Sequence, residues 1–257
     1  MRNLPDLRVV ALTEIMPHEN VDPLRVDRLA ARISAEGTQL NPMVCIEDIS
    51  GRFVLLDGAT RTAALGNIGL AYGVVQVVDA RSITLETWHH VVREAAPEAV
   101  MRHIEDNPNL ILADDQGTPR ISTVDGGRFA AHSDQLTPNG VLSALVDCYI
   151  GRWKVNRVVD PDLDSVASFY PDWASVVEFP TLSIDDVMKA ALGDDRLPAG
   201  ITRFIVPDRA LRVQADLSVL APGPQPEKQA LLDRLIEERS NTGRIRRYPQ
   251  SVVIYDE

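Results

Sequence analysis

Residues 54–65 read VLLDGATRTAAL, and this stretch decides the fold of the first part of the chain. A short apolar run ends in Asp57-Gly58 and a helix-forming run follows directly, which predicts a strand, a tight turn and a helix N-terminus. Thr60, Arg61 and Thr62 fall in the first helical turn, where backbone N–H groups lack intrahelical partners and carry the positive end of the dipole. Together these groups make a phosphate cradle. On this segment alone, a structural turn with a capped helix explains the pattern equally well.

The segments around this turn alternate between strand and helix patterns. Asp22 is typical of an N-cap, Pro23 of a first helical position and Gly37 of a helix end. The expected elements are a strand at 7–15, a helix at 23–36, strands at 43–46 and 53–56, a helix from about 60 to 69 and a strand at 74–78. This order predicts a mixed α/β unit over residues 1–83.

The chain changes character after residue 83, where we place a domain boundary. We expect a larger, helix-rich α+β domain over residues 84–257, so the chain as a whole falls in the α+β class. The expected helices begin at Trp88 and lie at 95–104, 139–149, 183–192 and 226–239. The expected strands lie near 205–206, 210–213 and 251–255.

Composition narrows the classes of protein that fit. The net charge of −11 and the isoelectric point of about 4.9 argue against binding along a nucleic-acid backbone, and the small cluster of Arg244, Arg246 and Arg247 favours a solvated surface. No apolar run reaches the roughly 18 residues of a membrane span, and the N-terminus lacks a signal-peptide pattern. Only two cysteines occur, so we expect a cytoplasmic protein without a disulfide framework.

Polar residues outside the central turn have both a functional and a structural interpretation. Glu19 follows a Pro-His turn, where a carboxylate can act as a general base, although a solvent-exposed loop acid has the same pattern. Thr202 and Arg203 precede a strand, where the arginine can clamp a carboxylate or simply lie on the surface. Trp88 and His90 flank another histidine, and without further ligands at helical spacing they do not predict zinc.

Taken together, these residues carry a resemblance to a known family. The stretch 15–79 resembles the N-terminal domain shared by ParB and sulfiredoxin, with a first box at Pro17-His18-Glu19 and a second at Asp57-Gly58-x-x-Arg61. Within this fold the chain most resembles the SbnI-like free serine kinases and their archaeal ADP-dependent relatives. That similarity extends to Thr87-Trp88-x-His90, to residues 198–204 and to residues 252–257, and so spans nearly the whole chain.

The resemblance implies a small-molecule kinase that transfers the terminal phosphate of ATP or ADP, with Mg²⁺, to the hydroxyl of free L-serine. Glu19 would act as the general base, and Asp57 would assist as a second carboxylate or through Mg²⁺. The residues implied to hold the nucleotide phosphates are Gly58, Thr60, Arg61 and Thr62. The residues implied to form the amino-acid pocket are Trp88, His90, Thr202 and Arg203, with Arg203 paired to the serine carboxylate.

One departure from the family pattern leaves the phosphate donor open. Many relatives place histidines within the second box, where this chain has Ala59 and Thr60. Two alternatives remain: a kinase for another small hydroxylated metabolite, and a ParB-like, nucleotide-dependent DNA-binding regulator, which the acidic composition disfavours. The oligomeric state and the pathway that uses the product are not predicted.

Overall fold

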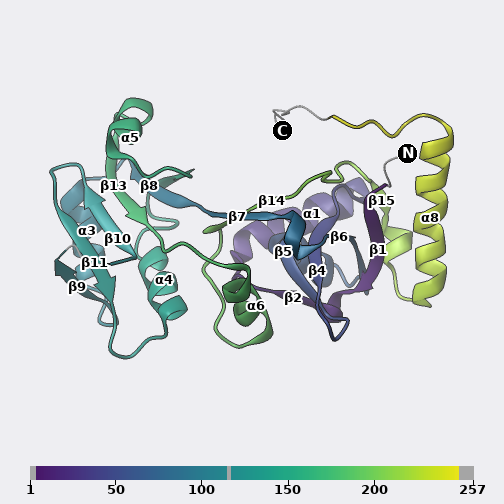
Figure 1. Ribbon diagram of the computed structural model, residues 1–257, viewed down its shortest axis with the longest axis horizontal. Helices are drawn as coiled ribbons and strands as arrows, with labels where there is room; N and C mark the ends of the chain where they lie inside the picture. The colour runs from purple at the N-terminus through teal and green to yellow at the C-terminus, as the bar shows by residue number, and fades with distance from the viewer. Residues whose placement is uncertain (1–3, 115–116, 249–257) are drawn as a thin grey trace.

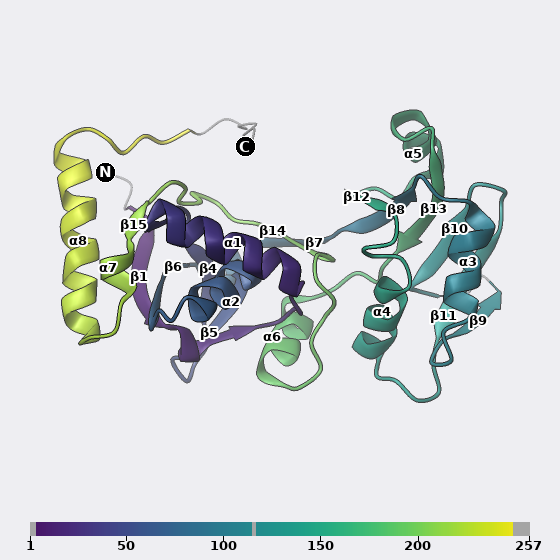
Figure 2. The same cartoon turned by 180° about the vertical axis from the view of Figure 1, so that it is seen from behind.

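The computed structural model describes residues 4–114 and 117–248. Two sheets lie at opposite ends of an elongated molecule (Figure 1), and the view from behind gives the same separation (Figure 2). The α+β class is confirmed. Within the described residues, no helix has the length and apolar character that crossing a membrane requires.

The first sheet is mixed and has the strand order β1-β6-β4-β5-β2. Its strands are β1 (Asp6–Ala11), β2 (Ile15–Pro17), β4 (Met43–Glu47), β5 (Phe53–Asp57) and β6 (Tyr72–Val77). Short 3₁₀ turns occupy Leu12–Glu14 and Ala80–Ser82. The pairs β2–β5 and β4–β6 are parallel, so the sheet contains both parallel and antiparallel pairs.

Helices α1 (Pro23–Glu36) and α2 (Ala59–Asn67) begin and end where the local chemistry predicts. The Asp22 side chain accepts a hydrogen bond from the Leu24 amide at 2.9 Å, and Pro23 occupies the first turn. Gly37 ends α1 with φ +68°, a conformation that glycine adopts without a steric penalty. The capping residues therefore fix the length of α1, whose C-terminal end leads back to the sheet.

Both faces of the first sheet are covered, which explains why its strands read as continuous apolar runs. In β4, Met43 and Cys45 face a core that also contains Leu232 from helix α8, whereas Val44 and Ile46 face a second core containing Val187 from helix α6. Helix α6 spans Ile184–Leu192 and helix α8 spans Gln225–Asn241. The short helix α7 (Leu217–Leu220) lies between them in the sequence. Ser183 caps α6 through a capping box with Asp186.

The second sheet is antiparallel and has the strand order β12-β8-β13-β10-β11-β9. Its strands are β8 (His89–Arg93), β9 (Ile111–Asp114), β10 (Arg120–Thr123), β11 (Arg128–His132), β12 (Lys154–Val158) and β13 (Trp173–Glu178). The accompanying helices are α3 (Pro97–Glu105), α4 (Pro138–Asp147) and α5 (Leu163–Phe169). The predicted helices at 95–104 and 139–149 match α3 and α4.

Strands contribute more to the second half of the chain than the sequence predicts. The predicted helix from Trp88 is wrong, because this segment leads from β7 (Thr84–Thr87) into β8, which pairs with strands on both sides. The predicted strand at 210–213 is also wrong, because the strand in this region, β15, spans Ala215–Asp216 and pairs with β3 (Thr38–Gln39). The predicted strand at 251–255 lies outside the described residues.

A two-stranded ribbon is one of the connections between the parts of the molecule. Strand β7 pairs with β14 (Thr202–Ile205) as an antiparallel ribbon, and the chain then returns to the first sheet, where α8 packs beside β1. Residues 213–236 contribute Val213, Leu220 and Leu232 to the first core. The boundary between residues 83 and 84 stays a prediction. The packing shows in addition that C-terminal residues belong to the core of the N-terminal sheet.

The return of α8 to the first sheet gives a test of stability. Leu232 is fully buried, whereas its neighbour Leu231 is 37% exposed. We expect Leu232→Ala to lower the free energy of unfolding by about 2–5 kcal/mol because it leaves a cavity in the core, as measured by urea denaturation. Leu231→Ala is the matched control and should change stability by less than about 1 kcal/mol. Equal effects of the two substitutions would contradict this packing.

Candidate functional site

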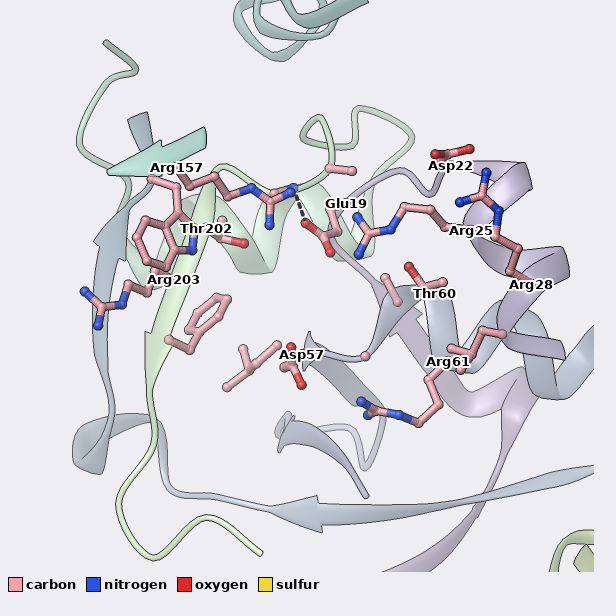
Figure 3. Close-up of a pocket in the computed structure, with 18 of the residues that line it drawn as sticks. Glu19, Asp22, Arg25, Arg28, Asp57, Thr60, Arg61, Arg157, Thr202 and Arg203 are labelled. Atoms are coloured by element: carbon pink, nitrogen blue, oxygen red, sulfur yellow. Dashed lines mark hydrogen bonds between the residues drawn. The ribbon is translucent and has the colours of Figure 1, made fainter. Parts of the chain in front are cut away.

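A cleft of about 760 Å³ opens where the two parts of the molecule meet (Figure 3). Its walls come from α1, the β5–α2 turn, the end of β7, strand β12 and the segment 199–209. It brings together eight of the ten residues predicted for the site: Glu19, Asp57, Gly58, Thr60, Arg61, Trp88, Thr202 and Arg203. Thr62 and His90 are not among the residues that line it.

The β5–α2 turn requires glycine at its corner. Gly58 has φ +108°, and a Cβ at this position would come within 2.8 Å of Arg61 Nη1 and 2.9 Å of Met43 Cγ. No side chain caps the start of α2, so the first amides of the helix keep their hydrogen-bonding capacity. The turn therefore presents backbone donors and the positive helix end at the wall of the cleft.

Arg61 and Thr62 hold this turn together from within. Arg61 Nη1 donates to the Pro42 carbonyl at 3.0 Å, and burial lowers the pKa of its guanidinium while the charge of Asp57 opposes that shift. The Thr62 hydroxyl is directed at the Gly58 carbonyl, 3.1 Å away, and at Met43 Sδ. Thr62 thus contacts its own helix start, and its predicted role toward phosphate stays a prediction.

Glu19 is anchored by the segment that follows α6. The backbone N–H of Leu197 donates to the His18 carbonyl, and that of Asn20 donates to the Leu197 carbonyl, both at 2.9 Å. The N–H of Gly200 donates to Glu19 Oε2, also at 2.9 Å. One carboxylate oxygen is therefore held, and the side chain remains half-buried at the cleft wall.

His18 joins β5 to β14 behind the cleft. Its Nδ1 lies 2.6 Å from the Leu55 carbonyl, which can only accept, so Nδ1 carries the proton and Nε2 accepts from the Thr202 hydroxyl at 3.0 Å. Burial lowers the pKa of His18 and keeps the ring neutral, although the nearby charge of Glu19 opposes this. The side chain of Thr202 is thereby fixed relative to the strand that ends at Asp57.

His90 supports the cleft from behind. It is buried, its Nε2 lies 3.4 Å from the Gly200 carbonyl, and its Nδ1 lies 2.8 Å from the Tyr149 hydroxyl. Because the carbonyl only accepts, Nε2–H is the donor and the tyrosine donates to Nδ1. Burial lowers the pKa of His90 to about 4, and the charge of Arg157 adds to this effect. His90 therefore contacts Gly200, which in turn contacts Glu19.

Trp88, Arg203 and Asp57 already have partners on the cleft walls. The Arg203 guanidinium lies 4.7 Å from the centre of the Trp88 ring, and its Nη1 is 2.8 Å from Glu86 Oε2. Asp57 forms an ion pair with Arg209. The predicted pairing of Arg203 with a serine carboxylate stays a prediction, and it would have to compete with Glu86.

Arginines dominate the cleft, and most of them are not among the residues predicted from the sequence. Seven arginines and three carboxylates line it, although the whole chain has a net charge of −11. The unpredicted arginines are Arg25, Arg28, Arg32, Arg157 and Arg209. The first three recur at spacings of three and four residues, a signal of one helix face that the sequence carried. An excess of guanidinium groups at a helix N-terminus favours an anionic, phosphate-bearing ligand.

Comparisons with known proteins show which proteins the chain resembles in sequence and fold. No family model matches the chain. It is 23% identical to the ATP-dependent L-serine kinase SbnI of Staphylococcus aureus, across 93% of this chain and 95% of that protein. The structure of SbnI with a C-terminal truncation matches with a TM-score of 0.73 at 21% identity, covering 91% of this chain and 97% of that one.

A free serine kinase in complex with AMP has the same fold. It matches with a TM-score of 0.73 at 14% identity, covering 85% of this chain and 95% of that one. The chain is thus a distant relative of SbnI with the fold of the free serine kinases, which confirms the resemblance seen in the sequence.

The neutral state of His90 predicts a pH dependence of stability. The unfolded chain binds a proton at this residue near pH 6.5, whereas the folded chain resists protonation down to about pH 4. The unfolded state is therefore favoured as the pH falls from about 6.5 towards 4, and we expect His90 to account for a loss of about 2 kcal/mol between pH 7 and 5.

Urea denaturation at the two pH values checks this expectation. His90→Gln should reduce the loss by about that amount, while His18 still contributes in the same direction. The exposed His132 provides the control, because His132→Gln makes the same chemical change away from the buried hydrogen bonds of His90. The same loss of stability between pH 7 and 5 in the wild type, His90→Gln and His132→Gln would show that His90 is not held neutral.

Proposed function

We propose that this protein is a free L-serine kinase that transfers the terminal phosphate of a nucleotide to the serine hydroxyl to give O-phospho-L-serine. The observation that carries the proposal is the position of Glu19 in the arginine-lined cleft that also contains the uncapped start of α2. The kinship with an ATP-dependent L-serine kinase over nearly the whole chain supports the same activity and favours ATP as the donor.

Glu19 is the proposed general base. Its Oε2 accepts from Gly200, which leaves Oε1 to take the proton of the serine hydroxyl. The serine oxygen forms a bond to the terminal phosphorus as the bond from that phosphorus to the nucleotide oxygen breaks. Phosphoryl transfer requires mainly positioning and charge neutralisation, and a single oriented carboxylate suits that requirement.

The β5–α2 turn is the proposed phosphate site. The open amides of α2, the Thr60 hydroxyl and the guanidinium of Arg61 supply donors on one wall, with Gly58 allowing close approach of the backbone. Within the described residues, no group of three or more His, Cys, Asp or Glu side chains could hold a metal. Mg²⁺ would therefore be held mainly by nucleotide phosphates and waters, with Asp57 as the protein ligand.

Trp88, Thr202 and Arg203 form the proposed amino-acid pocket on the opposite wall. The His18–Thr202 hydrogen bond fixes the threonine, and the indole provides an apolar surface for the short serine side chain. His90 acts through Gly200 and does not touch the substrate in this proposal. A cytoplasmic location, DNA binding and a different small hydroxylated substrate stay predictions from the sequence.

Incubation of the protein with L-serine, Mg²⁺ and either ATP or ADP tests the proposal. We expect O-phosphoserine, detected by mass spectrometry, with at least one of the two donors. L-threonine, L-homoserine and glycerol, offered in parallel, test the alternative substrates. Absence of phosphoserine with both donors, in a preparation that is folded by circular dichroism, would refute the assignment.

Substitution of the proposed base gives a sharper test. Glu19→Gln keeps the side-chain size and an acceptor for Gly200 but removes the basic carboxylate, so we expect kcat to fall by about 10²–10⁴ with little change in nucleotide affinity. The exposed Glu14 is the control, because it lies outside the cleft and Glu14→Gln should retain full activity. A fully active Glu19→Gln enzyme would rule out this mechanism.

A further inference from the structure

Two arginines approach Glu19 from opposite walls of the cleft. Arg25 extends from α1, next to the first sheet, and Arg157 extends from β12, at the edge of the second sheet. Their guanidinium groups lie on either side of the Glu19 carboxylate in Figure 3. No ion pair or hydrogen bond joins either guanidinium to another residue in the ranges 4–114 and 117–248.

The fold gives Arg157 a defined place. It lies opposite His90 in the β12–β8 register, and its guanidinium packs directly against the Cα of Gly200. A Cβ added to Gly200 would overlap that guanidinium, and the φ of +81° at this position disfavours any side chain. The glycine that binds Glu19 through its N–H thus also leaves room for the charge of Arg157.

The two positive charges of Arg25 and Arg157 exceed the single negative charge of Glu19 that lies between them. The pKa of Arg157 is lowered first by partial desolvation of its guanidinium within the cleft and then by the positive charge of Arg25, while Glu19 opposes the shift. Two positive charges on opposite walls thus face one carboxylate. An anion between them would offset the repulsion and accept hydrogen bonds from guanidinium donors that have no partner among the described residues.

We propose that Arg25 and Arg157 form a clamp on the terminal phosphate of the nucleotide, the group that is transferred. This inference rests on the proposed kinase function and adds two catalytic residues to it. Held from both sides, the phosphoryl group lies next to the base that activates the serine hydroxyl. Its developing charge is neutralised by groups that need no rearrangement during the reaction.

The phosphoryl group fits this position better than the serine carboxylate does. A carboxylate carries one charge and is satisfied by a single bidentate arginine, whereas a terminal phosphate carries up to two charges and three acceptor oxygens. Arg28 lies one turn beyond Arg25 on α1 and also lines the cleft, so the positive charge continues along the wall that includes Thr60. This line of charge leads from the open amides of α2 to Glu19.

Affinities for ATP, ADP and AMP, measured by isothermal titration calorimetry, test the clamp directly. We expect Arg25→Met and Arg157→Met each to lower the preference for ATP over AMP by about tenfold or more, because AMP lacks the clamped phosphate. We expect kcat for serine phosphorylation to fall by roughly 10²–10³. The double variant should lose less than the product of the two single effects, because both arginines act on one phosphate.

Controls separate the clamp from the kinase function on which it rests. Arg102→Met, at an exposed position on α3, should leave all these quantities unchanged. An unchanged ATP preference in both cleft variants would overturn the clamp even if the wild-type protein makes phosphoserine. A raised KM for serine at unchanged ATP preference would assign the arginines to the carboxylate and also overturn it. If the two variants lose the preference for ATP over AMP but the wild-type protein phosphorylates no serine, the clamp is retained and the kinase assignment is refuted.

Discussion

The backbone of Gly200 makes the contacts on which the arrangement of the cleft depends. Its N–H donates to Glu19, its carbonyl accepts from His90, and its Cα lies against the guanidinium of Arg157. Glu19 comes from the segment that follows β2 of the first sheet, and the other two partners come from two strands of the second sheet. One positive-φ glycine therefore links three side chains from distant parts of the sequence, and the position of Glu19 depends on how the two parts of the molecule dock.

Two neutral histidines make this docking specific. His18 connects Leu55 to Thr202, and His90 connects Gly200 to Tyr149, so each ring ties the 200–202 segment to a different sheet. Both rings are buried, and each acts as one donor and one acceptor only in the neutral form. The cleft thus has an excess of arginines at its surface, while the two histidines behind it are neutral.

Much of the first sheet and its helices could be predicted from local chemistry. Most of the second sheet could not, because its strands pair over long sequence distances. The caps at Asp22 and Gly37 and the turn at Gly58 depend on neighbouring residues, so the sequence alone located them. The strand after Trp88 was missed because its partners β12 and β13 lie some 60 to 90 residues away. Arg157 could not be predicted as a cleft residue for the same reason, because only the pairing of β12 with β8 brings it near Glu19.

A crystal structure of the protein with a non-hydrolysable ATP analogue, Mg²⁺ and L-serine is the most direct test of where the serine and the nucleotide phosphates bind. We expect the serine hydroxyl to lie within about 2.6–3.2 Å of a Glu19 oxygen, in line with the terminal phosphorus. The nucleotide phosphates should lie at the start of α2. Serine bound away from Glu19, or phosphates bound away from the β5–α2 turn, would contradict it.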